Sequence, residues 1–160
     1  MDKGESTCAV FLDLSKAFDT VDHKILLRKS MYYGIRDKQN YFFESYLTNR
    51  KQCTKVNNYS SKFQTIGCGV PQGSVMGPLL FLIYMNDLSC ASSFQTTFFA
   101  DDTRLHLSHK NIKTLQLNVQ NELDKVDTWM RSNRLSKNYN KTVYMIIILK
   151  CYHDICFPIE

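Results

Sequence analysis

Long hydrophobic stretches are missing from this sequence of 160 residues. No apolar run exceeds seven residues, as in Val143 to Leu149, whereas a membrane-crossing helix needs about 20. The N-terminus also lacks the apolar segment of a secretory signal. We therefore expect an intracellular protein that is not secreted and has no membrane partner.

Paired cysteines are missing too. The six cysteines are scattered, and none of them form a CxxC pair. We therefore expect reduced thiols and no disulfide framework. Cys151, His153 and Cys156 lie close together near the end, but they leave a zinc site one ligand short and their spacing fits no standard site, so zinc is disfavoured.

The sequence shows no internal repeat, low-complexity tract or linker. Its composition, with 44% hydrophobic and 22% charged residues, is typical of one globular domain. The net charge of +5 is a mild excess. Such an excess suits a polyanionic partner, but it is also common in proteins that bind none. Nothing in the sequence sets the oligomeric state.

Apolar spacing and turn residues predict an alternation of strands and helices. We expect strands at 8–14, 52–57, 62–68, 94–100, 104–108 and 143–149, and helices at 23–33, 37–47, 79–88 and 111–130. The strands at 52–57 and 62–68 are expected to form a hairpin with its turn at Asn57 to Ser61, and Asp22 is placed to cap the first helix. The last helix carries an apolar stripe of Ile112, Leu115, Val119, Leu123, Val126 and Met130. The strand at 8–14 is predicted to be central and buried on both faces, and 143–149 is also predicted to be buried. The helix at 37–47 is expected to bury Tyr41, Phe42 and Tyr46. Antiparallel strands with helices covering one face make an α+β fold.

Three acids follow strongly apolar strands. Asp13 ends the first strand, where an ionised carboxylate costs several kcal/mol unless it is paired or bound to a cation. Asp101 and Asp102 are adjacent and repel each other. Each acid has an ordinary explanation when taken alone, as a strand-end cap or a solvated turn. If the two strands lie side by side, a divalent metal explains all three acids together, because Mg²⁺ prefers carboxylate oxygens.

Four segments, in order, resemble motifs of one enzyme family. They are Ala9–Asp19, Gly69–Phe81, Phe99–Asp102 and the segment from Trp129 through Asn138 to Thr142. On these motifs, residues 8 to 145 resemble the reverse transcriptase of non-LTR (LINE-type) retrotransposons. The resemblance implies a right-hand polymerase palm, with an antiparallel sheet backed by helices.

The same resemblance implies the activity and the domain layout. We expect an RNA-directed DNA polymerase that uses an RNA template, a DNA primer and deoxynucleoside triphosphates and that acts in the nucleus. Residues 1–149 would form the palm with partial fingers and no thumb, and residues 150–160 would be a divergent C-terminal tail. The expected cofactor is a pair of Mg²⁺ ions, with Mn²⁺ as the alternative cation.

Individual roles also follow from the resemblance. Asp13, Asp101 and Asp102 would be catalytic metal ligands, and Lys141 would approach the triphosphate and protonate the pyrophosphate leaving group. The residues implied in nucleotide and template binding are Leu14, Phe18, Pro71, Gln72 and Gly73. Phe18 would exclude a 2′-hydroxyl from the incoming sugar; its alternative role is that of a core aromatic.

Rival interpretations remain open at this level. One is a non-catalytic retrotransposon remnant that at most binds nucleic acid. Another is a two-metal nuclease or phosphatase, which also uses clustered acids but gives no reason for Phe18 or the segment 69–78. Lys16, Arg50 and Lys51 would meet phosphates or simply face solvent. His23, His106 and His109 receive no role.

Overall fold

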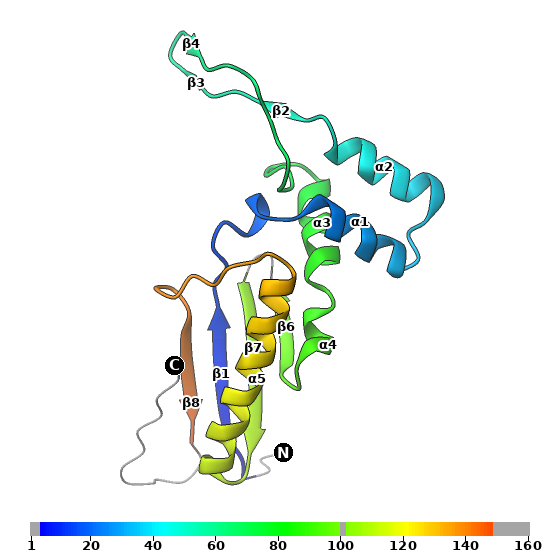
Figure 1. The fold of residues 1–160 in the computed structure, drawn as a ribbon. Coiled ribbons are helices and arrows are strands. Elements are labelled where there is room, and N and C mark those ends of the chain that lie inside the picture. Colours follow the sequence, from blue (N-terminus) through cyan, green and yellow to red (C-terminus); the bar gives the residue numbers. More distant parts are fainter. Residues whose placement is uncertain (1–3, 100–101, 149–160) are drawn as a thin grey trace. The chain divides into compact units, whose positions relative to one another are not determined.

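A computed structural model describes residues 4–99 and 102–148, which form two compact units (Figure 1). The sheet unit contains residues 4–15 and the described residues from 86 to 148. The helix-and-arm unit contains Lys16–Met85.

The sheet unit is built on four antiparallel strands in the order β6-β7-β1-β8. Their bounds are β1 (Ser6–Leu12), β6 (Gln95–Phe99), β7 (Asp102–His109) and β8 (Val143–Ile147). The predicted strand at 8–14 is therefore central, between β7 and β8, as expected. The predicted strands at 94–100 and 104–108 form the β6–β7 pair, and β7 begins two residues earlier than predicted.

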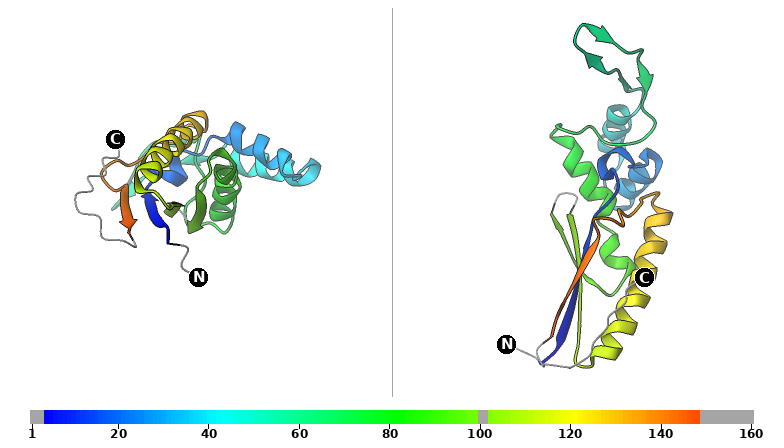
Figure 2. Two further views of the ribbon diagram at one scale, coloured as in Figure 1. Left: turned by 90° about the horizontal axis from the view of Figure 1, so that it is seen from below. Right: turned by 90° about the vertical axis from the view of Figure 1, so that its left-hand side faces the viewer.

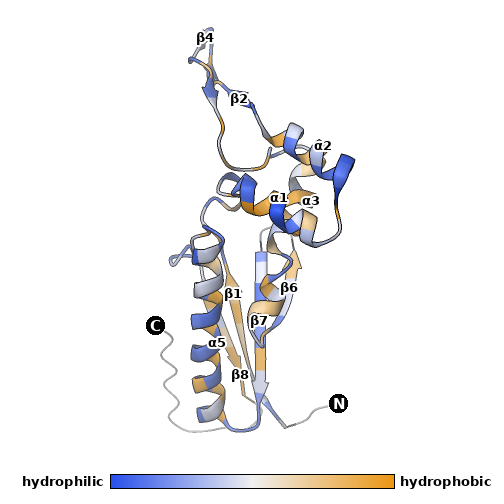
Figure 3. Ribbon diagram, turned by 45° about the vertical axis from the view of Figure 1, so that its right-hand side comes forward, coloured by the Kyte–Doolittle hydropathy of each residue, from blue (hydrophilic) through white to orange (hydrophobic). Residues whose placement is uncertain are grey.

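Helix α5 (Ile112–Ser132) packs against β1 and β7, and the short α4 (Leu88–Ala91) packs against α5 and β6. The Asn111 side chain caps α5 by accepting hydrogen bonds from two backbone N–H groups of the first turn. The predicted apolar stripe is confirmed: its buried members are Leu115, Val119, Leu123, Val126 and Met130. Figure 2 shows α5 lying along one face of the sheet, and Figure 3 shows hydrophobic residues recurring along α5 and β1.

Two burial predictions for the strands are wrong. Along β1, burial alternates, so that one face is buried and the other is half-buried, because α5 covers only the first face. β8 is an edge strand, and Val143, Met145 and Ile147 are each about half exposed. An apolar run predicts burial, but only the packing of neighbouring elements decides whether anything lies over it.

The helix-and-arm unit begins with the short 3₁₀ helix η1 (Ala17–Asp19) and contains α1 (His23–Tyr32), α2 (Asp37–Leu47) and α3 (Met76–Met85). α1 packs against both α2 and α3. The predicted N-cap is confirmed, because the Asp22 carboxylate accepts a hydrogen bond from the Ile25 N–H at 3.0 Å. The helix predicted at 79–88 begins three residues earlier, since Pro78 is tolerated in a first turn.

The predicted burial of aromatic residues on α2 is also incorrect. The helix has the predicted bounds, but Tyr41 is 72% exposed and Phe42 is 54% exposed. Tyr46 is half-buried, and the side chains that face the core are Phe43 and Leu47, four residues apart. A single stripe of a helix can meet its neighbours, so adjacent aromatic residues cannot all be buried.

A hairpin rises from the helices of this unit, and we call residues 50–66 the arm (Figure 1). Its base pairs β2 (Lys51–Gln52) with β5 (Gln64–Thr65), and its tip pairs β3 (Lys55–Val56) with β4 (Tyr59–Ser60). The predicted hairpin is confirmed, although the turn at the tip contains only Asn57 and Asn58.

The described cysteines are free, as expected for reduced thiols. Cys53, Cys68 and Cys90 are exposed, whereas Cys8 is buried in the core, and burial raises the pKa of its thiol to about 11. Cys151, His153 and Cys156 lie outside the described residues. Within the described part of the chain, no helix has the length and apolar character needed to span a membrane.

Candidate active site

The register between β1 and β7 ends one residue short of two of the predicted acids. The register runs to Leu12 opposite Thr103, so the next pair in this register is Asp13 and Asp102. Residues opposite each other in an antiparallel pair have Cβ atoms about 4.5–5.5 Å apart. The two apolar strands that precede the acids, β1 and β6, are not neighbours, because β7 lies between them in the sheet; Asp102 comes near the end of β1 because it begins β7.

Both carboxylates belong to the face of the sheet that α5 leaves uncovered. Leu12 and Leu14 are buried on either side of Asp13 in sequence, and Thr103 is buried next to Asp102. Because side chains alternate between the two faces of a strand, the acids project away from the core. Asp13 is half-buried and Asp102 is exposed, so both are accessible to a ligand.

The third predicted ligand, Asp101, lies outside the described residues. Within residues 4–99 and 102–148, no group of three His, Cys, Asp or Glu side chains is positioned to hold a metal ion. The pair formed by Asp13 and Asp102 fits Mg²⁺ in its chemistry, since this ion is typically held by one or two carboxylates together with substrate phosphates.

The loop before β8 holds the backbone of Asp13. The Asn138 N–H donates to the Asp13 carbonyl oxygen at 2.9 Å, and the Asp13 N–H donates to the Thr142 hydroxyl at 3.3 Å. Ser15 and Ser136 share a further backbone hydrogen bond. The segment around Lys141 is thereby tied to the first acid. The Lys141 side chain is exposed, and its backbone N–H bonds to the Asn138 carbonyl.

In the helix-and-arm unit, the loop at 67–73 is bonded to the last residues of the first motif and to the residues that follow it. The Gly69 N–H donates to the Val21 carbonyl at 2.8 Å, and the Val70 N–H donates to the Phe18 carbonyl at 2.7 Å. His23 Nε2 lies 2.7 Å from the Gly69 carbonyl oxygen. A carbonyl can only accept, so the ring nitrogen donates. These bonds fix the path of the loop.

Two glycines permit this close arrangement. At Gly69, where φ is +88°, a Cβ atom would lie 2.8 Å from the backbone oxygen of Asp19, and at Gly77 it would lie 2.4 Å from the Pro71 oxygen. Any larger residue would therefore displace backbone at both positions. Glycine at positions 69 and 77 thus has a steric cause within the fold.

The predicted nucleotide-binding residues are placed as follows. Phe18 is half-buried and its ring centroid lies 4.7 Å from that of Phe81. Gln72 is exposed, and its side-chain amide donates to the Asp19 carboxylate at 3.1 Å. Pro71 is half-buried and Gly73 is exposed. Leu14 is buried in the sheet unit.

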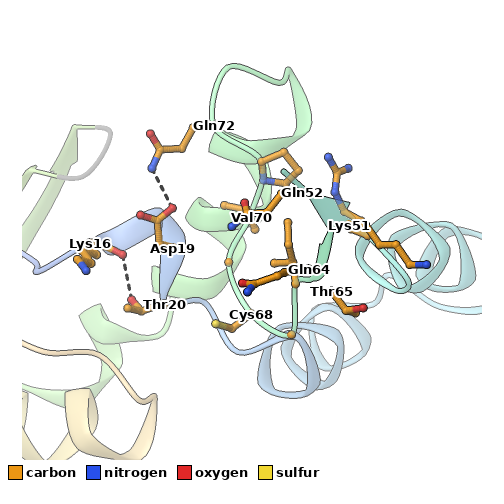
Figure 4. Close-up of a pocket in the computed structure, with 15 residues that line it drawn as sticks. Lys16, Asp19, Thr20, Lys51, Gln52, Gln64, Thr65, Cys68, Val70 and Gln72 are labelled. Carbon is orange, nitrogen blue, oxygen red and sulfur yellow. Dashed lines mark hydrogen bonds between the residues drawn. The ribbon is translucent and has the colours of Figure 1, made fainter. Parts of the chain in front are cut away.

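A cavity of about 760 Å³ lies between this loop and the base of the arm (Figure 4). Its lining includes Gln72 and Asp19 and the cations Lys16, Arg50 and Lys51. Three cations against one carboxylate favour an anionic ligand. Lys16, Arg50 and Lys51, which are predicted to contact phosphates, thus line the same cavity within a single unit.

Sequence reasoning missed several residues that position this site. Asp19 was included in the first motif without a function, and His23 received no role, yet both bond to the loop at 67–73. Asn138 and Thr142 were included in the fourth motif without a function. A signal was present in their position, since each lies within or beside a motif.

Comparison with known proteins gives a consistent result. The sequence matches the family described as reverse transcriptase (RNA-dependent DNA polymerase) over residues 1–153. It is 31% identical over 173 residues to a probable RNA-directed DNA polymerase from transposon BS of Drosophila melanogaster, which covers 99% of this chain and 18% of that protein.

Two further relatives come from other mobile elements. Identity is 30% to the RNA-directed DNA polymerase from mobile element jockey of Drosophila melanogaster, covering 88% of this chain and 16% of that protein. It is 28% to a retrovirus-related Pol polyprotein from the type-1 retrotransposable element R2 of Popillia japonica, covering 87% and 24%. The chain thus spans between about a sixth and a quarter of these relatives' length.

The fold also matches solved structures. Apo telomerase from Candida tropicalis, truncated from the C-terminal domain, superposes with a TM-score of 0.67 at 14% identity, covering 95% of this chain and 33% of that one. Telomerase from Candida albicans, solved with a fragment of telomeric RNA, gives 0.62 at 14% identity, covering 94% and 28%. The predicted α+β palm-type fold is confirmed.

Proposed function

Because the chain belongs to the reverse transcriptase (RNA-dependent DNA polymerase) family, we propose that it supplies the catalytic palm of an RNA-directed DNA polymerase. The proposed reaction adds deoxynucleotides to the 3′-hydroxyl of a DNA primer on an RNA template. The observation that supports the proposal is the register of β1 and β7, which ends with Leu12 opposite Thr103 and makes Asp13 and Asp102 the next residues along the two strands.

The proposed cofactor is Mg²⁺, as two ions held by Asp13, Asp101 and Asp102, with Mn²⁺ as the alternative. Bound there, the ions would supply electrostatic stabilisation of the attacking and leaving oxygens of an in-line displacement. The protein's part is to hold the carboxylates in place. The hydrogen bonds from Asn138 and to Thr142 restrain the backbone of Asp13 from both sides, which supports a preorganised pair.

Lys141 is the proposed general acid. Its exposed ammonium group is free to follow the triphosphate, and its segment is bonded to Asp13 through Asn138. From this position the lysine would donate a proton to the pyrophosphate oxygen as the bond to the α-phosphorus breaks.

The proposed substrate positions use the residues named by the sequence motifs. Gln72 and Gly73 would approach the nascent base pair, and Leu14 and Pro71 are also proposed to bind nucleotide or template. Phe18 would exclude a 2′-hydroxyl. Its contact with Phe81 supports this role, since a ring fixed by packing makes a firm steric barrier, and it is also what a core aromatic would show. Action in the nucleus is proposed from the family alone.

The decisive experiment is primer extension on an RNA template with Mg²⁺ and deoxynucleotides. It compares this chain with a longer protein that includes flanking segments of the length found in the relatives. Asp102→Asn should lower synthesis by about a hundredfold or more, because a lost carboxylate removes several kcal/mol of transition-state stabilisation. The matched control is Asp124→Asn, which changes an exposed acid on α5 and should leave synthesis unchanged.

Two results would contradict the proposal. Absence of extension by the longer protein would favour the non-catalytic remnant. Extension that survives Asp102→Asn would remove the metal assignment. Cleavage of the template without extension would instead favour the nuclease interpretation.

A further inference from the structure

The arm has no core of its own. Every side chain from Lys51 to Thr65 is exposed, and the arm's strands are each two residues long. Figure 2 shows the hairpin extending beyond the helices of its own unit. A two-stranded ribbon of this kind is marginally stable in water by itself. Its side chains are therefore available to a partner and contribute little to the fold.

Positive charge is concentrated on the arm. The arm carries Arg50, Lys51, Lys55 and Lys62 and no acidic residue, so its own charge is +4, and no acid occurs between Glu44 and Asp87. An exposed segment of this length that carries positive charges and no negative ones attracts a polyanion. Lys51 and Arg50 also line the cavity at the base of the arm.

Exposed rings are interleaved with these cations. Tyr59 is 86% exposed and Phe63 is 70% exposed. Phe63 lies in a bulge, since three residues on its strand oppose two on the partner strand between the base pairs and the tip pairs. A bulge turns a side chain away from the regular ribbon. Large exposed rings carry a hydration cost, which a planar ligand would relieve by stacking.

Cations with interleaved aromatic rings are the features that bind a single nucleic-acid strand, whose phosphates meet the lysines and whose bases stack on the rings. A duplex keeps its bases stacked internally and would leave both rings unused. A protein partner would cover the rings but gives no reason for four cations without an acid. The observations therefore favour a single strand.

The position of the arm indicates which nucleic-acid strand it would bind. The base of the arm, at Arg50 and Lys51, shares the cavity with Gln72, the residue that would approach the nascent base pair. The Arg50 guanidinium lies over the Tyr46 ring, 5.2 Å from its centroid, and this contact helps to hold the cation, which also lines the cavity. We propose that the arm binds the single-stranded RNA template as it approaches this cavity; this rests on the polymerase function proposed above.

The test is the binding of a fluorescent, unstructured RNA oligonucleotide to the full chain, without metal or nucleotides, at several salt concentrations. The ring variant Tyr59→Ser with Phe63→Ser should bind at least about tenfold more weakly, since stacking on each ring contributes to affinity. The charge variant Lys51→Gln, Lys55→Gln and Lys62→Gln should reduce the salt slope by about 2, at roughly 0.7 for each phosphate contact on a single strand.

Matched controls remove the same groups elsewhere. Lys24→Gln, Lys110→Gln and Lys113→Gln take three exposed lysines from other elements, and Tyr32→Ser with Tyr41→Ser takes two exposed rings. Both controls should bind RNA like the parent chain. The arm variants change only exposed side chains, so thermal unfolding should confirm that every variant is folded.

Three results would overturn the proposal: arm variants that bind like their controls, a charge variant that weakens binding while the ring variant does not, or duplex RNA bound as tightly as the single strand. DNA of the same sequence should bind no more tightly than RNA, and tighter binding would overturn the assignment to the template. The Asp102→Asn variant should bind RNA like the parent chain although it loses synthesis. A failure of the proposed polymerase function can therefore be distinguished from a failure of the proposed RNA binding by the arm.

Discussion

The two units of the chain hold their polar residues in opposite ways. In the sheet unit, Asp13 and Asp102 lie at strand ends, next to buried residues in the sequence. The N–H and carbonyl groups of Asp13 are both hydrogen-bonded. In the arm of the other unit, the polar and aromatic residues from Lys51 to Thr65 are all exposed. Rigid packing suits groups that must meet reacting atoms, whereas exposure suits groups that follow a long ligand.

The largest expected effect tests the packed side of this comparison. Leu105 is fully buried on β7. It lies two residues after Thr103, which is buried next to Asp102 and pairs with Leu12. Leu105→Ala should lower the free energy of unfolding by about 2–5 kcal/mol because it leaves a cavity. Denaturant titration measures this loss. Leu117→Ala, at a 67% exposed position of α5, should change the free energy by less than about 0.5 kcal/mol; equal losses would contradict the assigned core.

The next effect concerns the helix-and-arm unit. Phe18→Val should raise ribonucleotide incorporation relative to deoxynucleotide incorporation by about tenfold or more, since a small change in pocket volume is worth roughly 1–3 kcal/mol of discrimination. The ratio is measured by primer extension with each nucleotide. If Phe18 is only a core aromatic against Phe81, the variant should lose stability while the ratio stays unchanged.

A pH effect tests a buried acid outside the active site. Glu122 accepts hydrogen bonds from Lys125 Nζ and from the Ser93 N–H, both at 2.6 Å, and its side chain is 11% exposed. The Lys125 hydrogen bond, followed by the Ser93 bond, holds the pKa of Glu122 below its usual 4.5. A lowered folded-state pKa contributes stability above the usual carboxyl pKa, and this contribution is lost as the pH falls through the folded value.

Glu122→Gln should therefore lower the free energy of unfolding at neutral pH by about 1–2 kcal/mol. The difference from the parent chain should shrink as the pH falls below the usual carboxyl pKa of 4.5. Denaturant titration across this range is the measurement. Glu44→Gln, at an exposed acid on α2, serves as the control. A pH-independent difference would contradict the linkage.

The smallest effect is expected on the arm. Tyr59→Ser with Phe63→Ser should change the free energy of unfolding by less than about 0.5 kcal/mol, because neither ring is buried. Thermal unfolding checks this. A larger loss would mean that the rings stabilise the fold, and the contrast between the arm and the sheet unit would disappear.

Local signals predicted the elements well. The α5 stripe, the Asp22 cap and the bounds of α2 depend on residues only a few positions apart, and helix hydrogen bonds join such neighbours. Burial was predicted less well. Tyr41, Phe42 and the strand β8 look like core residues in the sequence, but no described element covers them, and an apolar residue is buried only where another element packs on it.

The sequence by itself determined the family, the caps and periodicity of the helices, and the identity of the acids, because these depend on residue types and short spacings. The tertiary structure decided that β1 pairs with β7 in the register that leads to Asp13 and Asp102, since this register joins strands far apart in the chain. It also decided that Asp19 bonds to Gln72 and that the arm stands free of any core. These outcomes depend on long-range packing, which no local pattern encodes.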